Sequence, residues 1–129
     1  MVWRGSIDSK NYVNDFTYEK IPYTCKQCEV HVGFYEAFRS VAKDTYDIVQ
    51  QLLAKYPSAK MTVTGHSLGA ALSTISAIET NKKSPKLATE IHNFGCPRIG
   101  NEKLAQHIRD EFDTLFRVIH NHDVYTHLP

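Results

Sequence analysis

The sequence carries almost no net charge, and it contains no long apolar run. Its 15 Lys and Arg residues nearly balance its 14 Asp and Glu residues, so the formal net charge is +1. Such a surface offers no electrostatic attraction for nucleic acid or for an anionic membrane. No segment has the roughly 20 consecutive apolar residues of a membrane-spanning helix, and the first residues do not have the pattern expected of a signal peptide. We therefore expect no nucleic-acid partner and no transmembrane segment.

What remains is the composition of an ordinary globular domain. The 129 residues are 42% apolar and 22% charged, and a chain of this length forms one domain at most. No repeat, low-complexity tract or linker is visible. Residues 1–3 resemble the last part of a strand, as though the chain began inside a sheet. We expect residues 1–129 to form a single, partial domain.

Cysteine is also scarce, and only Cys25, Cys28 and Cys96 are present. Cys25 and Cys28 have the C-x-x-C spacing, which suits half of a metal site, a redox pair or a local disulfide. A zinc site needs two more ligands, and no second C-x-x-C exists. A thioredoxin-like pair opens a helix, whereas this pair precedes the strand-like residues 29–32. A local disulfide is favoured, with two free thiols as the alternative, and Cys96 would be a lone buried thiol.

The most informative segment covers residues 61–72, where a β-branched strand turns through Gly-His-Ser-Leu-Gly into an apolar helix. A G-x-S-x-G pattern between a strand and a helix is typical of a nucleophile elbow, which lifts a serine above a sheet. In so sharp a turn, Cβ atoms at Gly65 and Gly69 would collide with neighbouring backbone. We predict that Ser67 is a nucleophile rather than part of a plain strand-to-helix turn.

The rest of the chain alternates between helical and strand-like patterns. Between residues 34 and 56 the apolar positions recur with a helical period, which Pro57 ends. The alternation predicts the α/β class, with a parallel sheet and helices on its faces. In chain order we expect a strand ending at residue 3, a short helix capped by Ser9, strand 30–32, helix 34–56, strand 60–64, helix 67–81, strand 90–94, helix 101–112 and strand 115–119.

Polar residues near the ends of these strands form a candidate catalytic site. In an open α/β sheet, functional residues gather beyond the carboxyl ends of the strands, and the hydrolase triad follows the order Ser, acid, His. Asp123 is therefore the predicted acid, and Asp110 and Asp113 are weaker candidates. The backbone N–H of Leu68, at a helix N-terminus, is predicted to bind the oxyanion. Ser6 would supply the second donor, unless it is only a turn residue.

Five segments of the sequence resemble, in order and at similar intervals, successive motifs of the class 3 (fungal-type) lipases. The segments are residues 3–6, 30–34, 63–69, 94–101 and 122–129. The resemblance covers nearly the whole chain and implies an α/β-hydrolase fold and hydrolysis of carboxylic esters. It further implies that Ser67 is the nucleophile, Asp123 the triad acid and Ser6 the second oxyanion residue.

The same resemblance implies a mobile lid and a secreted protein. In the family the lid follows the oxyanion residue, here at about residues 7–16. Its apolar side chains are Ile7, Tyr12, Val13 and Phe16. Polar residues dilute this apolar face, so it suits acylglycerols at a lipid–water interface and also soluble aryl esters. The segment 25–31 resembles that of lipase-related feruloyl esterases, which are secreted (extracellular) and in which Cys25 and Cys28 would form a disulfide.

One member of the expected triad, the histidine, has no counterpart in these motifs. Family members carry an N-terminal portion absent here and supply the triad histidine beyond the position of Pro129, so the chain resembles the central part of such an enzyme. His127 follows Asp123 too closely to be a good base. His120 and His122 could join Asp123 in a metal site, but an aspartate directed toward a histidine already explains their neighbourhood. We predict no metal.

We predict a serine hydrolase of carboxylic esters that forms an acyl-enzyme and needs no cofactor. Triacylglycerol lipase-like activity in lipid catabolism is favoured, and feruloyl or aryl esterase activity is the alternative. A different class of alternative is an inactive fragment or pseudoenzyme that serves as an interaction module. The missing histidine supports that alternative, whereas the elbow at Ser67, Ser6 and Asp123 oppose it.

Overall fold

The structure is a computed structural model that describes residues 1–5 and 18–127. Its main sheet has four strands in the order β1-β4-β5-β6, and β2 and β3 form a separate small sheet. The elements are β1 (Val2–Trp3), β2 (Lys20–Pro22), β3 (Glu29–His31), α2 (Val32–Lys55), β4 (Met61–His66), α3 (Leu68–Lys83), β5 (Ala88–Phe94), α4 (Glu102–Glu111), β6 (Thr114–Val118) and the 3₁₀ helix η1 (Val124–His127). The predicted α/β class is confirmed.

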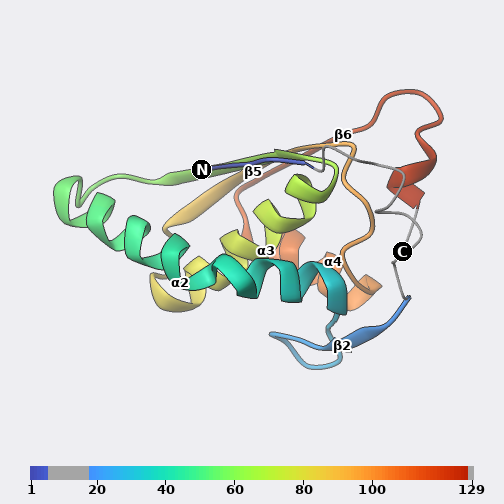
Figure 1. The fold of residues 1–129 in the computed structure, drawn as a ribbon, viewed down its shortest axis with the longest axis horizontal. Coiled ribbons are helices and arrows are strands. Elements are labelled where there is room, and N and C mark those ends of the chain that lie inside the picture. The colour runs from blue at the N-terminus through green and yellow to red at the C-terminus, as the bar shows by residue number, and fades with distance from the viewer. Residues whose placement is uncertain (6–17, 128–129) are drawn as a thin grey trace.

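All strands of the main sheet are parallel, so their carboxyl ends meet at one edge. Strand β4 lies between β1 and β5, and Gly65 is opposite both Trp3 and Asn93. Strand β5 pairs in turn with β6, where Phe94 is opposite Val118. Helices α2, α3 and α4 lie on one face of the sheet, below it in Figure 1. The edge formed by the carboxyl ends is therefore the place where a site can form.

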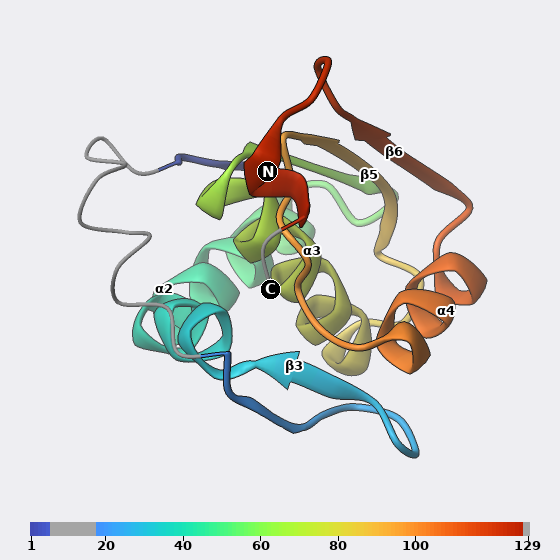
Figure 2. The same ribbon diagram turned by 90° about the vertical axis from the view of Figure 1, so that its right-hand side faces the viewer.

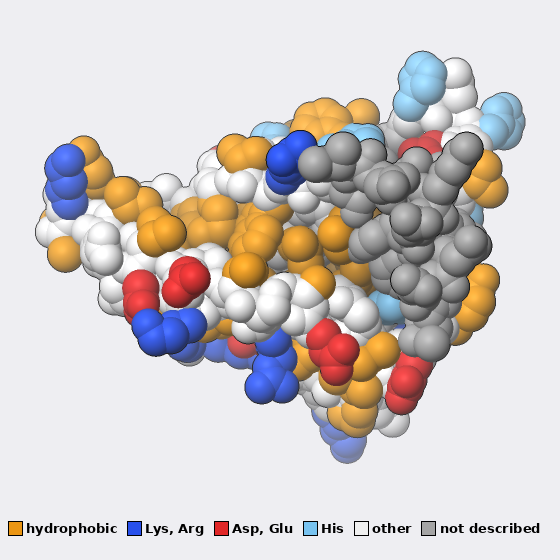
Figure 3. Space-filling view, in the orientation of Figure 1, with side chains coloured by type: hydrophobic (Ala, Val, Ile, Leu, Met, Phe, Trp, Pro, Cys, Tyr) orange, Lys and Arg blue, Asp and Glu red, His pale blue; other side chains and the backbone are white. Residues whose placement is uncertain are grey.

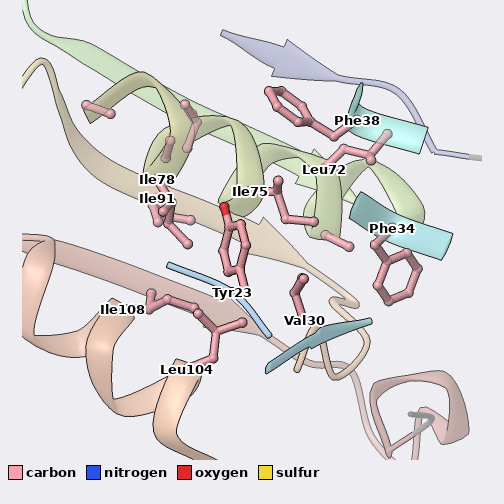
Figure 4. Packing of buried hydrophobic residues seen from close by; sticks show 14 of the residues in the cluster. Tyr23, Val30, Phe34, Phe38, Leu72, Ile75, Ile78, Ile91, Leu104 and Ile108 are labelled. Atoms are coloured by element: carbon pink, nitrogen blue, oxygen red, sulfur yellow. The ribbon is translucent and has the colours of Figure 1, made fainter. Parts of the chain in front are cut away.

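Helix α3 is the centre of the hydrophobic core. It lies between the sheet and α2, and residues 69–78 are all buried. Figure 4 shows Leu72 of α3 near Phe38 of α2, and Ile78 of α3 beside Ile91 of β5. A helix that is buried on all sides needs no polar stripe, which explains the apolar residues that follow Ser67 in the sequence.

The small sheet is a hairpin in which β3 corresponds to the predicted strand 30–32, shifted by one residue, whereas β2 was not predicted. Strands β2 and β3 pair antiparallel, with Ile21 opposite Val30. In the turn between them, the Tyr23 N–H donates to the Cys28 carbonyl at 2.8 Å, and Cys25 and Cys28 form a disulfide. The predicted local disulfide is thus present in the structure. Strand β2 was missed because its three residues, including a proline, show no alternating pattern.

The other predicted elements differ from the structure mainly at their ends. The long helix begins at Val32 rather than at residue 34, and α3 extends to Lys83. Strand β5 begins at Ala88, earlier than expected. Ends of this kind are set by local hydrogen bonds that periodicity does not resolve. The helix expected after Ser9 falls outside the described residues.

Apolar side chains of the described residues are exposed on the sheet and along α2, among other places. On the sheet face turned away from the helices, Phe94, Phe116 and Val118 are about half exposed. Hydrophobic side chains also reach the surface along α2 and between α2 and the sheet (Figure 3). Two exposed apolar residues of α2 are Ile48 and Leu52. None of the described helices has the length and apolar character needed to cross a membrane.

Parallel sheets are usually covered on both faces, and here the described helices cover one (Figure 2).

The disulfide predicts different reactivities for the cysteines. Cys25 and Cys28 should resist iodoacetamide in the native protein until a reductant is added. Cys96 is a free, buried thiol, and burial raises its pKa to about 12, so it forms little reactive thiolate and should react only after unfolding. Mass spectrometry of protein alkylated with and without reductant and urea checks both expectations. Labelling of Cys25 without reductant, in protein taken from its native compartment, would contradict the disulfide.

Candidate active site

Ser67 lies at the turn between β4 and α3 in a strained backbone conformation. Its φ of 54° and ψ of −124° are rare for a residue with a side chain. A hydrogen bond of 3.0 Å from the Ser67 N–H to the Phe94 carbonyl of β5 holds the turn. Ser67 is the N-cap of α3, yet its hydroxyl makes no capping hydrogen bond. The hydroxyl is thus left for another partner, as a nucleophile elbow requires.

Two glycines permit the close backbone contacts of this turn. A Cβ atom at Gly65 would overlap the carbonyl of Gly69, at the start of α3. A Cβ atom at Gly69 would in turn overlap the carbonyl of Trp3, at the end of β1. A side chain at either position would push α3 away from the sheet. The steric requirement predicted for these two glycines is therefore present in the structure.

The first turn of α3 places backbone N–H groups beside Ser67. Leu68 is the first residue of α3, so its N–H has no acceptor within the helix and lies at the positive end of the helix dipole. This is the environment that an oxyanion donor needs. The segment that follows β1 also reaches the elbow, since a Cβ atom at Gly5 would lie 2.8 Å from the His66 carbonyl oxygen.

The Asp123 carboxylate lies at the same edge of the sheet as Ser67. A Cβ atom built on Gly95 would lie 3.3 Å from Asp123 Oδ2 and 3.4 Å from His66 Nε2. Gly95 directly follows Phe94, whose carbonyl accepts the Ser67 N–H. Its φ of +55° also favours glycine. The end of β5 therefore brings the carboxylate to the neighbourhood of the elbow, which fits the role predicted for Asp123.

Two residues that the sequence analysis did not single out hold the Asp123 segment. Arg117 Nη2 of β6 donates to the carbonyls of Cys96, at 2.8 Å, and of Thr126, at 2.6 Å. Thr126 is buried, and its hydroxyl donates to the Asp123 carbonyl at 2.7 Å. These bonds connect β6, the loop after β5 and η1 around Asp123. Neither residue belongs to a recognisable spacing pattern, so only the three-dimensional structure reveals this contribution.

The remaining candidates lie elsewhere. Asp110 is exposed on α4, where its carboxylate accepts a hydrogen bond of 2.7 Å from the Gln106 side-chain amide. Asp113 is exposed just before β6 begins, at the end of that strand opposite to Asp123. No group of three His, Cys, Asp or Glu residues in the described part of the chain could hold a metal ion. Three histidines near Asp123 are exposed, namely His120, His122 and His127.

Part of the predicted site falls outside the described residues. This applies to the oxyanion candidate Ser6 and to the lid residues Ile7, Tyr12, Val13 and Phe16. Their roles stay predictions. The described part of the candidate site consists of Ser67, Leu68 and Asp123.

The parallel sheet and the serine elbow identify an α/β-hydrolase. The family model for Lipase (class 3) matches residues 1–129. Secreted mono- and diacylglycerol lipase 1 of Fusarium solani is 33% identical over 127 residues, which are 98% of this chain and 38% of that protein. The crystal structure of a lipase from Rhizopus microsporus var. chinensis has 31% identity and a TM-score of 0.88, over 98% of this chain and 45% of that one.

A further solved structure bears on the candidate site. It is described as showing that a serine protease triad forms the catalytic centre of a triacylglycerol lipase. It has 28% identity and a TM-score of 0.88, over 98% of this chain and 49% of that one. The chain therefore belongs to the class 3 lipase family. It spans about a third to a half of the length of the relatives it matches.

The elbow glycines predict a contrast between two Gly→Ala substitutions. Gly65→Ala should lower the free energy of unfolding by about 2 kcal/mol or more, because the new Cβ must displace the backbone of α3. Gly33→Ala should leave stability unchanged or raise it by up to about 1 kcal/mol, because Gly33 is exposed on α2 and Ala favours helix. Urea unfolding of the two variants measures both effects. Equal losses would contradict a specific steric requirement at Gly65.

Proposed function

We propose that the protein that contains this chain is a serine hydrolase of carboxylic esters, with Ser67 as its nucleophile. The observation that carries the proposal is the conformation of Ser67, which is strained, held by the Phe94 carbonyl and unused as a helix cap. Backbone strain of this kind persists only where the surrounding structure enforces it, and it is concentrated at functional sites. Its place at the carboxyl edge of a parallel sheet supports the same conclusion.

The geometry supports a two-step reaction through an acyl-enzyme. Ser67 Oγ would attack the ester carbonyl carbon while a histidine accepts its proton, and the tetrahedral intermediate would then expel the alcohol, which takes that proton. The N–H of Leu68, with Ser6 as second donor, would stabilise the oxyanion. Asp123 would accept the other imidazole N–H and orient the ring. Water would hydrolyse the acyl-enzyme by the same steps, so the reaction requires no cofactor.

The general base is proposed to be a histidine outside residues 1–129. His127 is exposed at the end of η1, only four positions after Asp123. A base must contact both the carboxylate and the Ser67 hydroxyl, which is hard to reconcile with so short a separation. The chain also covers only part of the length of its relatives, which leaves room for the base elsewhere in the intact protein.

Acylglycerols are the proposed substrates, and the intact protein is proposed to be secreted. Relatives of the chain from Rhizopus are lipases, and those from Fusarium solani and Penicillium cyclopium are secreted mono- and diacylglycerol lipases. The Cys25–Cys28 disulfide fits an oxidising compartment. Contact with a lipid–water interface through the lid, and activity on feruloyl or other aryl esters, are finer alternatives that a comparison of triolein and methyl ferulate as substrates would separate.

Ser67→Ala should abolish both covalent labelling by a fluorophosphonate and ester hydrolysis in the intact protein. The reason is that the phosphonate reacts with an activated serine hydroxyl, and no other group replaces it. Ser40→Ala is the matched control, because Ser40 is an exposed serine of α2 whose hydroxyl bonds only within its helix. Peptide mapping of the labelled protein locates the modified residue. Label on another serine, or turnover retained in Ser67→Ala, would refute the assignment.

The isolated chain of residues 1–129 should hydrolyse p-nitrophenyl esters poorly. Without a histidine base, only the oxyanion donors and substrate binding remain, which give about 10³–10⁴-fold over water and fall far short of a working enzyme. The intact protein should be active, and circular dichroism should show that the short chain is folded. Strong activity of the short chain that disappears in its His127→Ala variant would show that His127 is the base.

A further inference from the structure

Two buried asparagines connect helix α3 to strand β5, one at each end of the helix. Asn93 lies at the carboxyl end of β5 and bonds to the first turns of α3. Asn81 lies near the end of α3, and its side chain bonds to both the N–H and the carbonyl of Ala88, where β5 begins. Both asparagines are at most 9% exposed. They make the same kind of connection, but only Asn93 makes it next to the elbow.

Asn93 occupies the centre of a closed hydrogen-bond network. Its Nδ2 donates to the Ala70 carbonyl at 3.0 Å and to Thr74 Oγ1 at 2.8 Å, and its Oδ1 accepts from Ser73 Oγ at 2.6 Å. The Thr74 hydroxyl donates to the Ala70 carbonyl at 3.1 Å, and Ser73 Oγ lies 2.8 Å from the same carbonyl oxygen, so its one proton is shared between that oxygen and Asn93 Oδ1. All these groups are buried. Buried networks that are fully bonded fix one arrangement of the elements they join.

The network adjoins the backbone that holds Ser67. Asn93 is opposite Gly65 in the sheet, and its neighbour Phe94 accepts the Ser67 N–H. Ala70 lies in the same first turn of α3 as the N–H of Leu68, and its own N–H donates to the Ser67 carbonyl at 2.9 Å. Two adjacent residues of β5 therefore hold the elbow. Phe94 binds the Ser67 N–H through its carbonyl, and Asn93 binds the first turn of α3 through its side chain.

We propose that Asn93 is a positioning residue for the nucleophile, which fixes the first turn of α3 and with it the orientation of the Ser67 hydroxyl and the Leu68 N–H. The inference rests on the proposed function of Ser67. Gly65 and Gly69 allow α3 to approach the sheet closely, but the absence of a side chain does not fix the rotation of the helix. The Asn93 amide supplies that constraint, because its donors and acceptor match three groups at fixed positions on α3.

The test compares Asn93→Leu with Asn81→Leu in the intact protein. Both substitutions remove a buried amide of similar size that joins α3 to β5, so both should lower stability. Asn93→Leu should also lower kcat and the rate constant of fluorophosphonate labelling by about tenfold or more, with KM little changed, because small misplacements of reacting groups are costly. Asn81→Leu should stay within about twofold of the wild type. Urea unfolding of each variant, followed by circular dichroism, measures its folded fraction, by which the observed labelling rate constant is divided.

Asn93→Asp provides a milder variant with a pH signature. A buried carboxyl group has a raised pKa, and its protonated form regains one O–H donor for Ala70 or Thr74. The ratio of the variant's labelling rate to that of the wild type should therefore rise as the pH falls from 8 to 5. In Asn81→Asp this ratio should not change with pH, since Asn81 is remote from the elbow. A variant that loses only stability would show the same ratio for its folded molecules at every pH.

The outcomes separate this inference from the function it rests on. If the wild-type protein is not labelled at Ser67, the proposed function fails and the inference fails with it. If wild type and Asn93→Leu are labelled at the same rate, Asn93 is only structural, while Ser67 remains the nucleophile. Equal losses of rate in Asn93→Leu and Asn81→Leu would also overturn the positioning role. Slower labelling in Asn93→Leu alone, together with the pH-dependent ratio in Asn93→Asp, supports it.

Discussion

The close contact of three backbone segments at the elbow is the constraint on which the rest of the structure depends. The end of β4 touches the start of α3 at Gly65, and the start of α3 touches β1 at Gly69. Neither contact can accommodate a Cβ atom, so the register of β1 on β4 and the approach of α3 are fixed together. The strained conformation of Ser67 follows from this geometry, because the chain must reverse from strand to helix within one residue.

A helix placed so close to the sheet is buried on every side, and its polar side chains then specify its orientation. Ser76 accepts the Trp3 indole N–H at 2.9 Å, Ser73 bonds to Asn93, and Asn81 bonds to the backbone of Ala88. An apolar surface alone would allow α3 to rotate or slide with little loss of buried area. Hydrogen bonds to particular atoms of β1 and β5 prevent this rotation and sliding. Either movement would break these bonds and leave buried polar groups unpaired, which costs free energy.

Features of the fold and of the candidate site could be predicted from the sequence where they depend on neighbouring residues, and not where they depend on residues far apart in the chain. The elbow at Ser67, its two glycines and the helix and strand pattern depend on local sequence, and the structure has them close to where they were expected. The bonds of Asn93, and those of Arg117 to the Asp123 segment, join residues that come together only once the strands are in register. Strand β2 was missed for a related reason, because its pairing with β3 defines it more than its composition does.

The end of β5 shows how a few consecutive residues can join the two parts of the candidate site. Asn93 contributes its side-chain amide to α3, Phe94 contributes its carbonyl to Ser67, and Gly95 contributes the absence of a side chain beside the Asp123 carboxylate. The proposed nucleophile and the proposed acid thus lie against the same strand end, although 56 positions separate them in the sequence. Strand β5 and the bonds of Arg117 and Thr126 to the Asp123 segment then fix their relative position together, and catalysis by positioned groups demands such rigid support.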